Sequence, residues 1–170
     1  SASFVWINGQ EVGYNEGAFE AAEYDITSFL KPGKNTIAVN VIKYSDGVYL
    51  ESQDYWRLAG IFDDVWLYAK PAVHIFDWHA TTDLDENYEN AKLDLQVTVN
   101  NQSKSDKRHY RVRASLFDQD NVLVRDFTSD AVRITVGDRQ MINISSNVIN
   151  PRKWTAETPN LYRLVLELID

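Results

Sequence analysis

Apolar residues alternate with polar ones along several separate segments of the chain. A period of two predicts strands with one buried face, and no segment of comparable length shows the 3.6-residue period of a helix. Turn-forming pairs such as Asn8-Gly9, Asp46-Gly47 and Asn150-Pro151 separate these segments. The sequence therefore predicts an all-β protein built from sandwiches or jelly rolls. The alternating apolar positions are Ile37, Val39 and Val41; Leu93, Leu95, Val97 and Val99; Val112, Ala114 and Leu116; and Leu164, Leu166 and Leu168.

A boundary between two domains is predicted at Lys70-Pro71. Residues 61–68 have the composition of a strand that closes one unit, and residues 73–78 that of a strand that opens the next. Pro71 has no amide donor and suits a connecting segment. The domains are then residues 1–71 and 72–170, and the second has about a hundred residues, the size typical of an immunoglobulin-like sandwich. The chain has no Cys, so its core is held by packing alone.

Length and charge exclude several classes of function. A chain of 170 residues buries one or two modest cores but is too short for a (β/α)8 barrel of roughly 250 residues. A net charge of −8 argues against a nucleic-acid partner, which requires a basic surface. No apolar run approaches the roughly 20 residues of a membrane span. The spacing of His74, His79 and His109 suggests neither a metal site nor a catalytic triad.

The segment 44–62 is rich in side chains that could carry chemistry. It contains four aromatic rings before Phe62, those of three tyrosines and Trp56, together with the carboxylates of Asp46, Glu51 and Asp54 and one arginine. Rings can lie against the C–H face of a sugar while carboxylates accept hydrogen bonds from its hydroxyls. Composition alone favours the simpler interpretation, a structured loop whose rings pack in a core and whose acids pair with Arg57.

The residues of three separated blocks resemble the large multidomain β-galactosidases of glycoside hydrolase family 2. Tyr44-Ser45-Asp46-Gly47 through Gly60-Ile61-Phe62 is nearly colinear with a nineteen-residue family segment, although Asp63 replaces the usual arginine and Ser52 an aspartate. Supporting blocks lie upstream and downstream, in the family's order. They are Val5-Trp6-Ile7-Asn8-Gly9-Gln10-Glu11-Val12-Gly13-Tyr14, the segment from Glu23-Tyr24-Asp25-Ile26 to Asn35, and Trp154-Thr155-Ala156-Glu157-Thr158-Pro159-Asn160-Leu161-Tyr162.

The resemblance implies the end of a sugar-binding, galactose-binding-like jelly roll followed by most of an immunoglobulin-like sandwich that lacks its last strand. It places both catalytic glutamates on a barrel outside this chain, so we assign no catalytic residue here, and the chain alone is expected to be inactive. It gives one site residue: Asp46 matches the family's aspartate that binds the galactosyl group and a sodium ion at the rim of the active site. Sodium and magnesium are implied for the complete enzyme only.

Several large side chains are expected to have structural roles. Trp56 is expected to be buried between the loop and the domain body, so that its replacement by Ala costs roughly 3–5 kcal/mol. Arg57 is expected to pair with a loop carboxylate. Trp154 and Tyr162 are expected to be core anchors of the second sandwich.

Two functions remain open on the sequence. In the first, the chain is a noncatalytic part of a retaining β-galactosidase-like hydrolase, which braces the catalytic barrel of the same chain and contributes Asp46 to β-galactoside binding. In the second, it is a stand-alone carbohydrate-binding or adhesion module. The Ser45-Asp46-Gly47 turn favours the first. The sequence does not determine the aglycone or the oligomeric state of the parent, for which a homo-oligomer is one option. It also leaves the compartment open between cytoplasmic, periplasmic and secreted.

Overall fold

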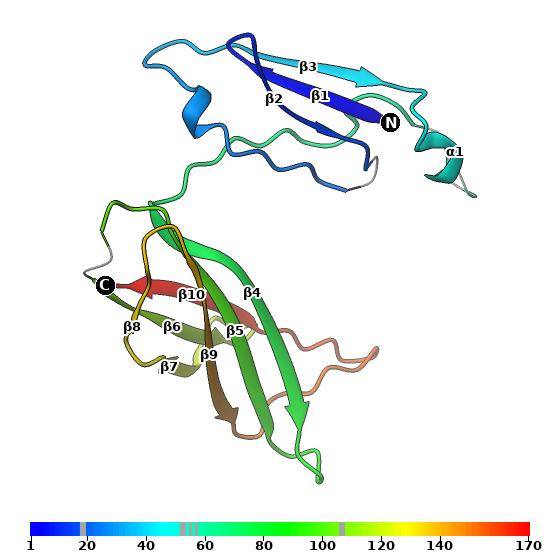
Figure 1. Cartoon of the computed structure of the whole chain (residues 1–170). Helices are drawn as coiled ribbons and strands as arrows, with labels where there is room; N and C mark the ends of the chain where they lie inside the picture. The colour runs from blue at the N-terminus through cyan, green and yellow to red at the C-terminus, as the bar shows by residue number, and fades with distance from the viewer. Residues whose placement is uncertain (18–19, 52–53, 55, 57, 106–107) are drawn as a thin grey trace. The chain divides into compact units, whose positions relative to one another are not determined.

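The computed structural model describes all residues except 18–19, 52–53, 55, 57 and 106–107 (Figure 1). The regular secondary structure of the described residues is almost entirely β, as the alternation predicted. The chain divides into two compact units, Ser1–Leu67 and Tyr68–Asp170. Among the described residues, no helix has the length and apolar character needed to cross a membrane.

The first unit contains a three-stranded antiparallel sheet in the order β2-β1-β3. Its central strand buries Val5 and Ile7. The alternating positions predicted for residues 37–41 do form a strand, with the side chains of Ile37 and Val39 exposed. The elements of this unit are β1 (Ala2–Ile7), β2 (Gln10–Asn15), the 3-10 turn η1 (Thr27–Phe29), β3 (Ile37–Ile42) and the single helical turn α1 (Val48–Glu51).

The hairpin between β1 and β2 turns at Asn8-Gly9, where both residues have positive φ angles of 52° and 83°. This is the pair of conformations that a tight hairpin turn requires and that Asn-Gly adopts at low cost. The Asn8 side chain also donates to the carbonyl of Phe29 at 2.9 Å and to Oδ1 of Asn35 at 2.8 Å. Asn35 in turn bonds both the amide and the carbonyl of Lys31. The two asparagines therefore tie the hairpin turn to the loop that precedes β3.

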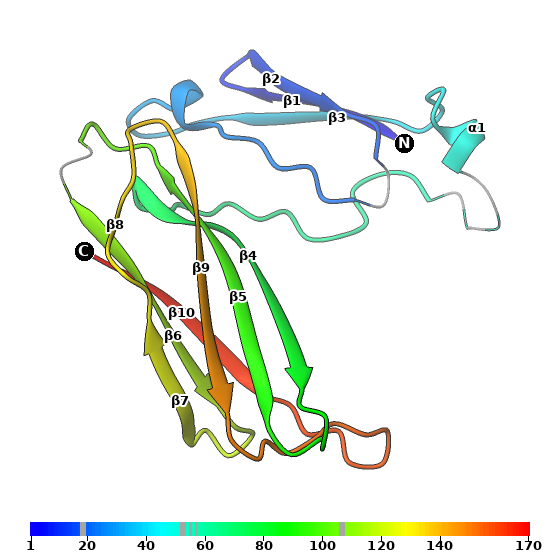
Figure 2. The same cartoon turned by 60° about the horizontal axis from the view of Figure 1, so that its bottom comes forward.

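The second unit is a sandwich of two antiparallel sheets, as Figure 2 shows. One sheet has the order β4-β5-β9, and the other has the order β10-β6-β7 with the short β8 paired to β6. This is the immunoglobulin-like sandwich that was predicted. Its strands are β4 (Val73–Leu84), β5 (Ala91–Asn101), β6 (His109–Phe117), β7 (Leu123–Thr128), β8 (Val132–Arg133), β9 (Arg139–Val148) and β10 (Arg163–Ile169).

The core of the sandwich lies between the two central strands, β5 and β6. Val97, Val99, Val112 and Ala114 have no exposed surface, and the other predicted positions of these strands are buried beside them. Leu164, Leu166 and Leu168 of β10 pack against this cluster and are partly buried. The predicted alternation is thus confirmed, because alternate residues of both sheets point into one shared core.

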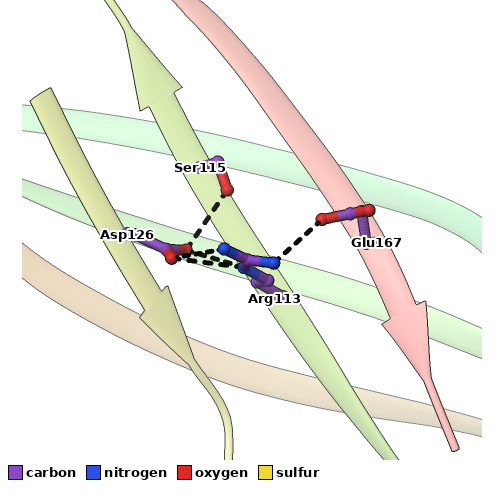
Figure 3. A network of polar contacts seen from close by, with 4 residues as sticks. All are labelled: Arg113, Ser115, Asp126 and Glu167. Carbon is purple, nitrogen blue, oxygen red and sulfur yellow. Dashed lines mark hydrogen bonds and ion pairs between the residues drawn. The ribbon is translucent and has the colours of Figure 1, made fainter. Parts of the chain in front are cut away.

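The outward face of the sheet β10-β6-β7 carries a connected group of polar side chains (Figure 3). Arg113 of β6 lies between Asp126 of β7 and Glu167 of β10, and Ser115 also donates to Asp126, at 3.2 Å. Glu167 is therefore part of an ion-pair network.

Two sequence expectations for the fold are wrong. Residues 61–68 form no strand, and Val65, Trp66 and Leu67 are largely exposed. A strand is defined by a ladder of backbone hydrogen bonds to a neighbouring strand, and among the described residues this segment joins no sheet. Trp154 is 61% exposed rather than a core anchor, and its backbone forms an isolated bridge with Pro159.

Tyr162 behaves as predicted. Its side chain packs against the sandwich core, and its hydroxyl accepts a hydrogen bond of 2.7 Å from the amide of Arg152. A tyrosine placed this way buries its ring and still satisfies its polar end.

Candidate substrate-binding site

Asp46 lies in the turn that follows β3, directly before α1. The carbonyls of Ser45, Asp46 and Gly47 accept hydrogen bonds from the amides three residues later, with N···O distances of 3.0–3.3 Å. These contacts coil residues 45–51 into one helical turn and leave the Asp46 side chain exposed at its start. A short carboxylate on a tight turn can extend away from the domain body.

The turn borders an open hollow of about 360 Å³ on one face of the sheet, a volume within the range of small-molecule sites. The register of the sheet explains its composition: Phe4 of β1 pairs directly with Tyr14 of β2, and Ala2 pairs with Ile42 of β3. Alternate residues of a strand share a face, so these side chains lie together beside the end of β3. The lining residues are Ala2, Phe4, Tyr14, Ile42, Tyr44, Ser45 and Asp46.

The surroundings of Asp46 favour the ionised form of its carboxylate. Its pKa lies below the usual range, first because the Glu16 side chain shares a hydrogen bond with it, and then because backbone N–H groups of Asp46 and Gly47 bond to it. A hydrogen bond to Glu16 and the nearby charges of Glu16 and Asp46 also raise the pKa of Tyr14 to about 12. Tyr14 therefore remains a neutral donor, and Asp46 an anionic acceptor, over the whole physiological range.

Ser45 adds an unused polar group to this hollow. Its Oγ is covered by neighbouring atoms and has no hydrogen-bond partner among the described residues. A buried hydroxyl without a partner costs about 1–3 kcal/mol, so a rotation that brings it to a ligand in the hollow is favourable.

Asp46 could serve as one ligand of a bound cation. Asp46 offers the oxygen ligand that hard cations prefer. Across the described part of the chain, however, no three or more His, Asp or Glu side chains gather as a metal site. Asp46 thus fits the role of one ligand among several, and the remaining ligands of such an ion would come from elsewhere.

Only Asp46 of this group was predicted from the sequence. Tyr14 and Glu16 were missed, although the Asn8-Gly9 turn sets the register that places Tyr14 opposite Phe4. The buried position expected for Trp56 is wrong, since this side chain is 84% exposed. The pairing expected for Arg57 lies outside the described residues. Glu157 is exposed and joins no cluster of acids.

The fold and the site define a class of protein. It is an all-β protein of two units, a sheet with a hollow lined by aromatic rings and a carboxylate, and an immunoglobulin-like sandwich.

The chain belongs to the glycosyl hydrolases of family 2. Residues 1–71 match the model of the sugar binding domain of that family. Residues 73–170 match a second model described as glycosyl hydrolases family 2.

Curated relatives of high similarity are β-galactosidases. The β-galactosidase of Priestia megaterium is 43% identical over 170 residues, which cover 99% of this chain. That of Pectobacterium atrosepticum is 42% identical over 173 residues and 99% of this chain. The chain spans 16% of the length of each of these relatives.

Solved structures share the fold. The β-glucuronidase of Bacteroides uniformis is 28% identical with a TM-score of 0.87, covering 98% of this chain and 21% of that enzyme. A structure described as a β-galactosidase of Bacteroides fragilis has a TM-score of 0.86 over 100% of this chain and 26% of its own, at 19% identity, so it supports the fold alone.

Proposed function

We propose that this chain is a noncatalytic part of a family 2 β-galactosidase, in which Asp46 binds the galactosyl group of the substrate. Residues 1–71 and 72–170 are then its sugar-binding and immunoglobulin-like domains, and they brace a catalytic barrel carried by another part of the same protein. That barrel would hydrolyse terminal β-galactosides with retention, using two carboxyl groups about 5–5.5 Å apart.

The position of Asp46 carries this proposal. It is an ionised, exposed carboxylate on a tight turn at the border of an aromatic hollow. An anionic acceptor there can bind two sugar hydroxyls at once through charge-assisted hydrogen bonds. The identity of 36–43% to proteins named β-galactosidase supports the same substrate class.

A sodium ion bound through Asp46 would supply fixed positive charge to a sugar oxygen. The oxygen chemistry of Asp46 suits such an ion, and the other ligands belong to segments outside this chain. Magnesium, if the complete enzyme uses it, would be held by the catalytic barrel.

A β-glucuronidase is the second candidate, because the Bacteroides uniformis enzyme of that activity is 28% identical to this chain. The charge around the hollow disfavours it. Glu16 and Asp46 share a hydrogen bond there, so the pair keeps at least one negative charge, and a glucuronide would bring a further carboxylate close to it. Like charges at this distance repel, whereas a neutral galactoside avoids that cost.

The test compares hydrolysis of aryl β-galactoside, β-glucuronide and β-mannoside by the complete enzyme and its Asp46→Asn variant, at several sodium concentrations. We expect galactosidase activity in the parent. In the variant, which keeps the shape and removes the charge, we expect kcat/KM to fall about a hundredfold or more and the response to sodium to be lost.

Glu11→Gln is the matched control, since it removes an exposed carboxylate of β2 that does not line the hollow. It should leave activity and sodium response unchanged. An Asp46→Asn enzyme as active as the parent would remove the site assignment. A parent that cleaves only the glucuronide would replace the proposed substrate, and a parent inactive on all three would favour a binding or adhesion module.

A further inference from the structure

Three aromatic rings form a continuous row on the face of β1 and β2 beside Asp46. The Phe4 and Tyr14 rings have centroids 4.6 Å apart, and those of Phe4 and Trp6 are stacked 5.9 Å apart. Tyr14 remains 47% exposed despite these contacts, and the other two rings are partly exposed. The row leads away from the turn that carries Asp46, so it extends the candidate site beyond a single carboxylate.

The composition of this face matches a sugar ring better than an apolar partner. Rings supply a flat apolar surface for the C–H groups of a pyranose. At the edge of the row, the Asp46 carboxylate offers acceptors and the Ser45 hydroxyl a donor for its hydroxyl groups. An apolar protein segment would bury the charge of Asp46 away from water and leave the Ser45 hydroxyl without a partner.

We propose that Phe4 and Tyr14, with Ser45 at the edge, bind the leaving-group sugar of a disaccharide substrate, next to the galactosyl unit that Asp46 contacts. This inference rests on the proposed function, because it takes Asp46 to mark the galactosyl position. The exposed ring of Tyr14 is the main stacking surface, and Phe4 supports it from the opposite strand.

The experiment uses the complete enzyme with two substrates that share the galactosyl group. Lactose carries a second sugar ring, and methyl β-galactoside carries only a methyl group. For Tyr14→Leu, which keeps apolar bulk and removes the ring, we expect kcat/KM for lactose to fall about three- to tenfold, the range of one lost ring contact, while that for methyl β-galactoside stays within about twofold.

Tyr14→Phe separates stacking from the hydrogen bond to Glu16. This variant keeps the ring and loses the hydroxyl, so its selectivity for lactose over the methyl galactoside should stay close to that of the parent. If Tyr14→Leu fails to fold, Phe4→Leu replaces it as the variant that removes a ring from the row.

Failure of the leaving-group subsite can be told apart from failure of the proposed function. Asp46→Asn should lower activity on both substrates alike, whereas the Tyr14 effect is confined to lactose. Equal losses on both substrates would mean that another segment of the enzyme covers this face, and no loss on lactose would mean that the row contacts nothing. Either result overturns the subsite, and an enzyme that cleaves neither substrate overturns both proposals.

Discussion

Arg113 of β6 and Asp126 of β7 form an ion pair with two hydrogen bonds across neighbouring strands of the sheet β10-β6-β7. The Nε of Arg113 donates to Oδ1 of Asp126 at 3.0 Å and its Nη2 to Oδ2 at 2.7 Å (Figure 3). The two residues are diagonal neighbours, because Asp126 lies opposite Ser115 in the register. Such two-point pairing fixes the orientation of both side chains, and it lowers the pKa of Asp126.

This pair makes part of the stability of the chain depend on pH. The pKa of Asp126 is lower in the folded state than the value of about 3.9 expected when unfolded, so the stabilisation is complete above that value. It is lost as the pH falls through the folded-state pKa. We therefore expect Arg113→Met to lower the melting temperature at pH 7, and the difference from the parent to shrink below about pH 4. Thermal unfolding followed by circular dichroism from pH 7 to pH 3 measures this.

Arg111→Met is the matched control, since Arg111 is an exposed arginine two residues earlier on the same face of β6. It should change the melting temperature little at any pH. A gap between Arg113→Met and the parent that stays constant with pH would assign the loss to packing of the arginine stem instead of to the ion pair.

The sequence predicted the sandwich well where one face of each strand is buried in a regular alternation. Leu95 and Val97 of β5 alternate with polar residues and lie in the core, so the pattern alone located them. It failed for Trp56 and Trp154, because an apolar residue is buried only if a surface exists to cover it, and composition does not show that surface. Asp46 could be singled out only through the family resemblance. Glu16 becomes visible only once the fold brings it near Asp46.

Asn101 is expected to be the most sensitive polar residue of the sandwich. Its buried side chain donates to the carbonyl of Ile134 at 2.8 Å and accepts from the amide and hydroxyl of Ser103 at 2.9 and 2.6 Å. Asn101→Ala leaves several of these groups unpaired, so it should cost about 1–3 kcal/mol of unfolding free energy. Urea unfolding of the chain provides the value.

Asn143→Ala is the control for that change. Asn143 is exposed on β9 and, like Asn101, begins an Asn-X-Ser sequence. Its replacement should alter the unfolding free energy by no more than about 0.5 kcal/mol. Equal effects of the two substitutions would show that the hydrogen bonds of Asn101 add nothing to stability.

Gly13 of β2 is expected to be intolerant of a side chain. A Cβ at this position would lie 2.6 Å from a ring carbon of Tyr24, closer than the two atoms can approach. Gly13→Ala must displace that ring, and we expect a loss of about 1–3 kcal/mol in urea unfolding.

Two comparisons test whether the Tyr24 ring causes the loss of stability in Gly13→Ala. At Gly17 a Cβ would meet its nearest neighbour at an ordinary 3.6 Å, so Gly17→Ala should be neutral or slightly stabilising. In a Tyr24→Ala background, Gly13→Ala should cost much less than in the parent. A Gly13→Ala loss of the same size in both backgrounds would rule out the ring as its source.

Trp56 is expected to contribute little to the stability of this chain, contrary to what its place in the family segment suggested. Its side chain is 84% exposed, so truncation removes little buried area, and Trp56→Ala should change the unfolding free energy by no more than about 0.5 kcal/mol. Ile7→Ala in the same unit is the comparison, because Ile7 is buried in β1 and its truncation should cost about 2–5 kcal/mol. Urea unfolding of both variants, followed by circular dichroism, shows whether Trp56 contributes as an exposed or as a buried side chain. A cost of several kcal/mol for Trp56→Ala would mean that this ring packs against the domain body in solution.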